Sequence, residues 1–530
     1  FKNENINKYL KKNIKLNKEY EAKNDSKILI DLTLNSHPLY AISNCYMGIE
    51  LAKLNKLSIV GNVIKNDYLT YFIAKSFGIK EFIFIDEGNF LCRLGYFIKS
   101  LKLIPANKIA KKIVNISLDN IEIGKASYEH AIRNYKYSPL KKNNFLLYLA
   151  LSKSLRSLDL SKKIFNKHQF KYYILSELQF IPNRIFFQRA LLRKISVYSK
   201  IGNDQVGATL YKSFSKRNLS RDTISKETSN FIKKKLFQNK NIVEKFHKKV
   251  LSAKPIGEEK YFKKHIKLKI AKKIKNKFEL YKQFEFDIKK PIVLILPHVM
   301  IDNVLNFNNS VFLSPMFWYI ETLKKIKSLK NVNWLIKPHP SEIKYDTDLT
   351  SKNLFKEYVG YENHIKFWSN DIIVSNIHKH INSVITCLGS PGYQYPSLGI
   401  PSITTAESKY SHFNCSISPK NKKEYFKILM NIKKLRKLNN NTKFSAKIFW
   451  FVNEKIIRIK NTSIPVFDDT REFNQSIFWN IMQKSVNKRG KNVFNEMLKI
   501  QDKNQNRHTI EFKELQIKKS IFKKIRFNDA

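Results

Sequence analysis

Two short segments in the second half of the chain place the strongest limits on its fold. Residues 334–342 read WLIKPHPSE, and residues 383–403 read SVITCLGSPGYQYPSLGIPSI. Each starts as an apolar strand and runs into a loop rich in Pro or Gly, and the second loop opens a helix. In an open α/β sheet, ligands bind outside the carboxyl ends of the strands. We therefore expect His339 and the loop 389–392 to share one edge of a sheet, in the layout of a nucleotide-phosphate site.

Short apolar runs alternate with segments of helical periodicity in both halves of the chain. This alternation is typical of βαβ units around a parallel sheet. The predicted strands cover 27–33, 57–60, 81–86, 171–177, 195–198, 291–298, 333–337, 383–387 and 400–404, and the predicted helices 41–54, 69–77, 184–192 and 317–329. The expected fold class is α/β, with two Rossmann-like domains, a helical linker and C-terminal helices.

The expected organisation has six parts. These are a polar N-terminal extension (1–24), a Rossmann-like acceptor domain (25–221), a helical linker without strands (222–289), a Rossmann-like nucleotide-donor domain (290–420), C-terminal helices (421–490) and a basic tail (491–530). The tail is rich in Lys, Asn and Gln, which favours a frayed end.

The chain is strongly basic, with 98 Lys and Arg against 43 Asp and Glu and a formal charge of +55. Such a charge is typical of proteins that bind nucleic acid or an anionic membrane surface. However, Lys, Asn, Ile and Phe are all abundant while Gly and Pro are scarce, which is the composition that an AT-rich genome gives to most of its proteins. The basic residues are also spread along the chain rather than clustered, so we expect anionic small substrates and no specific nucleic acid.

Compartment and metal content follow from smaller signals. The four cysteines are widely spaced, match no zinc or redox pattern, and suit a reducing cytoplasm. No apolar run approaches the roughly 20 residues that span a bilayer. The first residue is Phe, which leaves open a segment removed ahead of it. We expect a cytoplasmic protein, with no metal and no cofactor, peripheral at the inner face of the membrane.

The His-bearing turn 337–340 is the first candidate for chemistry. Pro338 and Pro340 end the strand and stiffen the turn around His339. An imidazole can donate a hydrogen bond to a phosphate oxygen where a leaving group gains negative charge. Lys337 adds charge if its side chain faces the ligand, and His298 ends another predicted strand at the same edge.

The glycine loop 389–392 is the second candidate. Gly389 and Gly392 allow the backbone to approach a ligand, and Pro391 suits the first turn of a helix whose N–H groups would face an anion. Ser390 adds a hydroxyl donor, and Gln394 is placed to bind a ribose or sugar hydroxyl. Tight turns between strand and helix also need glycine, so the loop has an ordinary structural explanation as well.

A general base is not singled out by the sequence. Transfer to an acceptor hydroxyl needs a carboxylate or imidazole to take its proton. The candidates in the N-terminal domain are Glu177 at the end of a predicted strand, Asp31 near the end of the first strand, and Glu129 after Gly124.

At these motifs the chain resembles bacterial capsule and surface-polysaccharide biosynthesis proteins, the group related to Kdo and other capsule glycosyltransferases. The resemblance covers about 291–415, including the strand ending in His298 and both motifs above, and extends to the upstream segment 121–133. It implies the GT-B architecture, with two domains facing a cleft, and a nucleotide-sugar donor held by His339, Gly389, Ser390 and Gly392. Related proteins often have an acidic residue where this chain has Gln394, and an Asp where it has Glu129.

The leading hypothesis is therefore a metal-independent glycosyltransferase of capsular or surface polysaccharide biosynthesis. Its partners would be a nucleotide-sugar, a glycan or lipid-linked acceptor, an anionic inner-membrane surface and polysaccharide assembly proteins. The alternatives are a polyol-phosphate transferase of the teichoic-acid type, a non-catalytic scaffold, and a basic nucleic-acid-binding protein.

Overall fold

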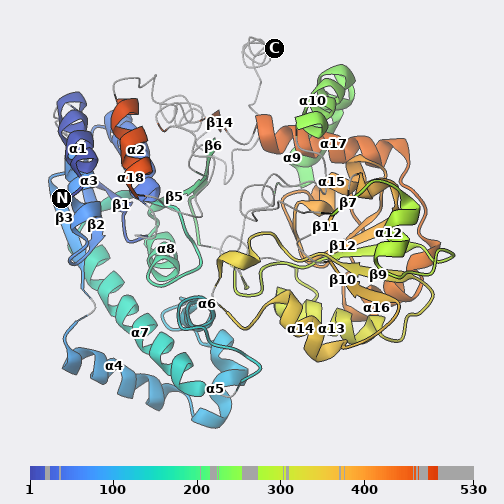
Figure 1. The fold of residues 1–530 in the computed structure, drawn as a ribbon. Coiled ribbons are helices and arrows are strands. Elements are labelled where there is room, and N and C mark those ends of the chain that lie inside the picture. Colours follow the sequence, from blue (N-terminus) through green and yellow to red (C-terminus); the bar gives the residue numbers. More distant parts are fainter. Residues whose placement is uncertain are drawn as a thin grey trace. The chain divides into compact units, whose positions relative to one another are not determined.

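The computed structural model shows two compact α/β units (Figure 1). Unit 1 combines residues 1–219 with 457–530, and unit 2 is formed by 220–456. The residues that the structure describes are 1–17, 24–34, 38–86, 88–141, 143–202, 205–214, 224, 226–253, 272–302, 304–305, 309–345, 347–368, 372–374, 376–456, 459–460, 464 and 475–486.

Unit 1 is built on a seven-stranded sheet in the order β14-β6-β5-β4-β1-β2-β3. Its strands are β1 (Asn24–Asp31), β2 (Leu57–Ile64), β3 (Glu81–Ile85), β4 (Phe170–Leu175), β5 (Ser196–Ile201), β6 (Gln205–Tyr211) and β14 (Ile459–Lys460). The five strands from β5 to β3 run parallel, and β6 and β14 are antiparallel to their neighbours. The strand order reverses between β1 and β4, which makes their carboxyl ends the switch point where ligands of doubly wound sheets bind.

The helices of unit 1 cover both faces of this sheet. They are α1 (Glu4–Leu16), α2 (Pro38–Asn55), α3 (Tyr68–Ser76), α4 (Phe90–Leu103), α5 (Ala106–Lys112), α6 (Ile123–Asn134), α7 (Asn144–Lys167), α8 (Asn183–Leu192) and α18 (Gln475–Ser485). Alternate residues of β1 enter two separate cores, with Ile28 and Ile30 in one and Leu29 in the other. A strand buried on both faces reads as a continuous apolar run, which is why this sheet is visible in the sequence.

Unit 2 is built on a five-stranded parallel sheet in the order β10-β9-β8-β12-β13. Its strands are β8 (Ile292–Leu296), β9 (Asn333–Ile336), β10 (Ile365–Phe367), β12 (Ile381–Thr386) and β13 (Ser402–Thr404), and a separate parallel pair joins β7 (Lys272–Ile274) to β11 (Ile372–Val374). The helices are α9 (Lys226–Phe237), α10 (Lys240–Ala253), α12 (Lys277–Gln283), α13 (Pro315–Ile326), α14 (Ser351–Tyr358), α15 (Pro391–Ser397), α16 (Lys422–Met430) and α17 (Asn440–Lys455). Here the order reverses between β8 and β12.

The predicted fold class, two Rossmann-like α/β domains, is confirmed. Several expectations about the segments between and beside them need correction. The extension 1–24 contains α1, which packs into the core of unit 1, and the strand β7 lies inside 222–289, where only helices were expected. Helices α9 and α10 of that segment group with unit 2, whereas α18 groups with unit 1. The predicted tail 491–530 lies outside the described residues.

In the described part of the chain, no helix has both the length and the apolar character needed to cross a bilayer.

Candidate functional site

The carboxyl edge of the unit 2 sheet brings together the residues singled out in the second half of the sequence. The strands β9, β8 and β12 are adjacent, and the His339 turn, His298 and the glycine loop follow them respectively. The rings of His298 and His339 lie edge to face, with centroids 6.0 Å apart. His298 and the glycine loop flank the switch point between β8 and β12, where this class of sheet binds its ligands.

The turn around His339 defines the tautomer of its ring. The backbone N–H of Ser341 donates to Nδ1 of His339 at 3.1 Å, and that of Glu342 donates to the His339 carbonyl at 2.9 Å. Because Nδ1 accepts, the proton of the neutral ring lies on Nε2 and makes this atom a hydrogen-bond donor. In His298, Nε2 lies 3.1 Å from the carbonyl oxygen of Asp302, to which it donates.

Lys337 takes a different position from the one needed for a surface phosphate contact. Its side chain is buried, and its ammonium lies 5.0 Å from the centroid of the Trp368 ring. A cation over an indole face is stabilised by the ring quadrupole. This packing accounts for a lysine at the end of β9 without a ligand.

The glycine loop is held by Tyr410. The Tyr410 hydroxyl donates to the Gly389 carbonyl at 2.8 Å, and a β-carbon at position 392 would lie 2.0 Å from the same hydroxyl oxygen. Gly392 is therefore required by the close approach of Tyr410, whether or not a ligand binds here. Gly389 and Gly392 both have negative φ, so neither is needed for a left-handed turn.

Several amides of the loop are already bonded within it. The N–H groups of Gly392, Tyr393 and Gln394 donate to the carbonyls of Gly389 and Ser390 at 3.0–3.1 Å. The following helix α15 is only seven residues long. Ser390 is exposed, and its hydroxyl makes no capping bond to this helix, while Gln394 is half-buried one turn further on. The hydroxyl of Ser390 is thus better placed to meet an anion than the N–H groups of the helix.

Glu342, the last residue of the first motif, has a structural role, as do the aromatic residues of α13. Glu342 accepts hydrogen bonds from the N–H and the hydroxyl of Ser351 at 2.6 and 2.7 Å, and so caps α14. Burial raises the pKa of Glu342, and the bonds from Ser351 oppose the shift. In α13, Trp318 and Tyr319 are core residues, and the indole N–H of Trp318 donates to the Tyr425 hydroxyl at 3.0 Å.

The carboxyl edge of the unit 1 sheet carries a second polar cluster, centred on Asp31 at the end of β1. The Thr33 hydroxyl donates to its Oδ1 at 2.8 Å, and the side-chain amide of Asn183 donates to its Oδ2. Burial raises the pKa of Asp31 from 3.8 to about 6, although these hydrogen bonds act in the opposite direction. A carboxylate with a pKa near neutrality is suited to general-base work.

Glu177 follows β4, and Lys200 lies near the carboxyl end of the adjacent strand β5. Lys200 is buried, its ammonium donates to the Gly202 carbonyl at 2.6 Å, and it lies 5.7 Å from the centroid of the Tyr40 ring. Burial lowers the pKa of Lys200 from 10.5 to about 7, against the opposing attraction of Glu177. The carboxyl edge of the unit 1 sheet therefore carries an acid, Asp31, and a base, Lys200, whose pKa values are both displaced towards neutrality.

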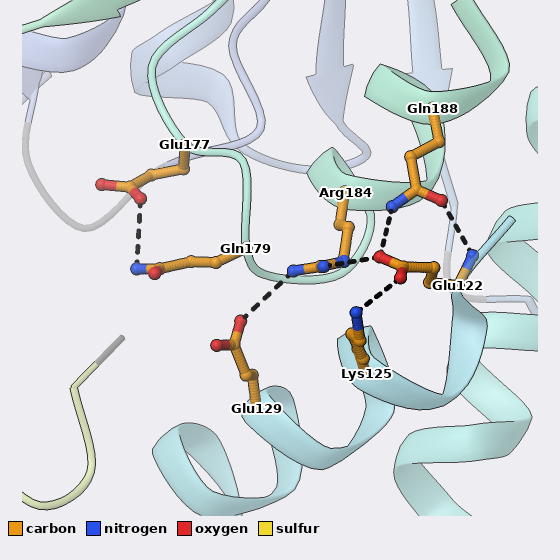
Figure 2. Close-up of polar contacts among 7 residues, drawn as sticks. All are labelled: Glu122, Lys125, Glu129, Glu177, Gln179, Arg184 and Gln188. Atoms are coloured by element: carbon orange, nitrogen blue, oxygen red, sulfur yellow. Dashed lines mark hydrogen bonds and ion pairs between the residues drawn. The ribbon is translucent and has the colours of Figure 1, made fainter. Parts of the chain in front are cut away.

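Glu129 belongs to a separate ion-pair network (Figure 2). Arg184, at the start of α8, is buried between two carboxylates, with Glu122 at 2.8 Å and Glu129 at 3.8 Å. Lys125 also pairs with Glu122, at 2.5 Å. Figure 2 shows the Arg184 guanidinium directed to Glu122 and Glu129, with Glu177 on the other side of the loop, where Gln179 donates to it at 3.3 Å. Glu122 precedes α6 and Glu129 lies in it, so their ion pairs with Arg184 hold α6 against α8.

Sequence reasoning missed Lys200, Asn183 and Arg184. Lys200 lies in β5, a strand that was predicted to end at Tyr198, so a longer predicted strand would have placed it near the sheet edge. The roles of Asn183 and Arg184 depend on partners more than fifty residues away, which no local pattern reveals. Among the described residues, no group of three or more His, Cys, Asp or Glu is arranged to hold a metal ion.

The fold and both sheet edges define a protein of two doubly wound α/β units, each with polar side chains at its switch point. Solved structures to which the chain is similar include the β-Kdo 2,7 transferase KpsC from Thermosulfurimonas dismutans, at 12% identity over 61% of this chain and 89% of that one, with a TM-score of 0.31. The wall teichoic acid polymerase TagF matches at 12% identity over 92% of this chain and 95% of that one, with a TM-score of 0.21.

A UDP-GlcNAc 2-epimerase from Neisseria meningitidis, bound to UDP-GlcNAc, matches at 11% identity over 81% of this chain and 98% of that one, with a TM-score of 0.22. No protein-family model and no curated protein matches the chain. At such identities and TM-scores the function must rest on the chain's own residues.

Proposed function

We propose that the protein is a GT-B-type glycosyltransferase that builds capsular or other surface polysaccharide from a nucleotide-sugar. The observation that carries the proposal is that the rings of His298 and His339 lie 6.0 Å apart after the adjacent strands β8 and β9, while Ser390 follows the next strand of the same sheet edge, β12. This is the edge of a doubly wound sheet where nucleotide ligands bind. The resemblance of the motifs to capsule glycosyltransferases supports the same assignment.

The donor chemistry assigned to unit 2 is the stabilisation of a departing phosphate. As the bond between the anomeric carbon and the phosphate oxygen breaks, that oxygen gains negative charge. The Nε2–H of His339 and the hydroxyl of Ser390 are the donors proposed to meet this charge. Lys337 and Gly392 are left out of this role because their positions are explained by Trp368 and Tyr410. Gln394 is assigned to bind hydroxyl groups of the donor. His298 is assigned to shape the site beside His339.

The acceptor chemistry is assigned to unit 1. The acceptor hydroxyl gives up its proton while its oxygen bonds to the anomeric carbon, and a carboxylate takes that proton. Asp31 and Glu177 are the candidates because they lie at the switch point of the sheet, whereas Glu129 is held by Arg184. Asp31 is favoured over Glu177 by its pKa of about 6.

Polyol-phosphate transfer is the second candidate function, since it uses a donor with the same anionic phosphates. The acceptor in either case would be a glycan or a lipid-linked glycan, handled in the cytoplasm at the inner face of the membrane beside polysaccharide assembly proteins. Metal independence is part of the proposal, and activity that survives EDTA would support it.

The first test is thermal stabilisation of the full chain by CMP, CDP, UDP, GDP and dTDP, compared with the His339→Ala variant. Stabilisation by one nucleotide, lost in the variant, is the expected result and names the donor class. A panel of nucleotide-linked sugars and polyols then separates the two transferase functions. If no nucleotide stabilises the wild-type protein, the proposal is overturned in favour of a scaffold, or of nucleic-acid binding if DNA or RNA stabilises it instead.

A further inference from the structure

Helix α4 exposes a continuous apolar stripe. Five of its large apolar side chains are exposed by 41–73%, namely Phe90, Leu91, Leu94, Ile98 and Leu101. At about 100° per residue, these five positions fall within one side of the helix roughly 100° wide. Such a stripe in a folded domain marks a surface that another apolar phase covers.

Another side of α4 holds the helix on unit 1. The Tyr96 hydroxyl donates to Asp159 of α7 at 2.8 Å, and Ser100 is fully buried. Phe97 lies 5.6 Å from Phe145 and 6.4 Å from Tyr148 between ring centroids. Figure 1 shows α4 along the side of α7 that faces away from the seven-stranded sheet. These contacts fix α4 on unit 1 and leave its apolar stripe exposed.

Basic residues accompany the stripe, and acidic residues are absent from its neighbourhood in the sequence. By helical geometry Lys102 lies beside the stripe, about 20° from Leu91, and Arg93 lies about 60° beyond Phe90; both are exposed. Three further exposed lysines lie on α5, at positions 108, 111 and 112. Residues 88–118 contain no Asp or Glu.

We propose that α4 is an interfacial helix that docks unit 1 onto an anionic lipid surface. Its apolar stripe would enter the boundary between headgroups and acyl chains, while Arg93, Lys102 and the α5 lysines would meet anionic headgroups. A helix of 14 residues is too short to span the roughly 20-residue core, so it lies on the membrane. The proposal is independent of the transfer reaction, because it requires neither nucleotide nor acceptor.

The test is flotation of the full chain with vesicles of phosphatidylcholine alone and with about 30% phosphatidylglycerol, where we expect about tenfold tighter binding to the anionic vesicles at low salt. The double variant Phe90→Ser/Leu94→Ser should lose at least about tenfold of this binding. The matched control is Phe278→Ser, since Phe278 is 66% exposed on α12 of unit 2 and Phe90 is 69% exposed. This control should bind as the wild type does, and circular dichroism checks that each variant is folded.

A second measurement reports directly which side of α4 enters the lipid surface. Cys92 is the one exposed cysteine of the four and is first replaced by Ser. An environment-sensitive fluorophore at Leu94→Cys should shift to the blue on anionic vesicles, whereas one at Lys99→Cys, on another side of the helix, should not. Equal binding to both vesicle types, unchanged binding of the double variant, or equal shifts at both labels would each overturn the proposal. So would a wild-type dimer that the double variant converts to a monomer, because the stripe would then be covered by a second copy.

Discussion

A β-carbon at Gly392 would lie 2.0 Å from the hydroxyl oxygen of Tyr410, which is buried and cannot swing out into solvent. The glycine that looks like a phosphate-binding residue in the sequence is thus required by an aromatic side chain eighteen positions later. The two explanations differ in what a methyl group at this position would do.

Gly392→Ala should destabilise unit 2 by about 1–3 kcal/mol, because a packed core must shift to admit the methyl group. The matched control is Gly95→Ala on α4, where a β-carbon meets nothing within 4 Å. That change should stabilise unit 1 by about 0.5–1 kcal/mol through helix propensity. Urea unfolding followed by circular dichroism measures both. If Gly392→Ala is as stable as the wild type but loses nucleotide binding, the glycine serves the ligand instead.

His339 can be tested with two amides that each mimic one ring nitrogen. Asn places an acceptor near Nδ1 and should keep the bond from Ser341, while Gln places a donor near Nε2. If Nε2–H meets the donor phosphate, His339→Gln should retain more nucleotide stabilisation than His339→Asn. The opposite order, with Asn better than Gln, would assign His339 to holding its turn.

Arg184→Met should cost unit 1 about 3–5 kcal/mol, because it leaves two carboxylates in or near the core without their shared cation. Lys125→Met removes a more exposed partner of the same Glu122 and should cost less than about 1 kcal/mol. A triple change that also makes Glu122 and Glu129 into Gln should recover much of the loss. Urea unfolding reports each variant, and equal costs for the Arg184 and Lys125 changes would contradict the buried network.

The ion-pair network of Arg184 also predicts how the free energy of unfolding changes at acidic pH. Burial acts to raise the pKa of Glu122, but Arg184 and Lys125 outweigh it and hold the pKa below 4.5. A carboxyl whose pKa is lowered on folding stabilises the protein above its unfolded value and loses that contribution as the pH falls through the folded value. Unfolding free energies measured from pH 6 down to pH 3 should therefore fall less steeply in the triple variant than in the wild type.

Asp31 predicts the opposite trend. Its pKa is raised by burial from 3.8 to about 6, so the folded state binds a proton more tightly than the unfolded state between these values. Its contribution to stability therefore falls by about 2 kcal/mol as the pH rises from 4 to 7. Over this pH range the free energy of unfolding of Asp31→Asn should therefore rise by about that amount relative to that of the wild type.

Ser176→Ala is the control for Asp31, because Ser176 bonds to Asn44 at the same sheet edge and does not titrate. The difference between this variant and the wild type should stay constant from pH 4 to 7. A constant difference for Asp31→Asn as well would show that Asp31 has an ordinary pKa.

The central strands of both sheets could be predicted because strands buried on two faces are apolar runs, such as IVLIL in β8. The same runs place His298, His339 and the glycine loop on one edge. Short strands such as β10, with the sequence IKF, carry no such signal. The burial of Lys337 could not be predicted either, because the ring that receives it, Trp368, follows a different strand. Local patterns located the edges of the sheets, while the partners of each side chain depended on tertiary packing.

The last described helix of the chain completes the first unit. Trp479 of α18 is fully buried, its ring lies 5.3 Å from that of Tyr9 in α1, and Lys12 donates to the Gln483 carbonyl at 3.2 Å. During synthesis, residues 1–219 leave the ribosome long before Trp479 exists, and all of unit 2 is made in between. Until then the nascent N-terminal unit exposes the apolar surface that this tryptophan later covers. Unit 1 can therefore complete its core only after α18 has been synthesised.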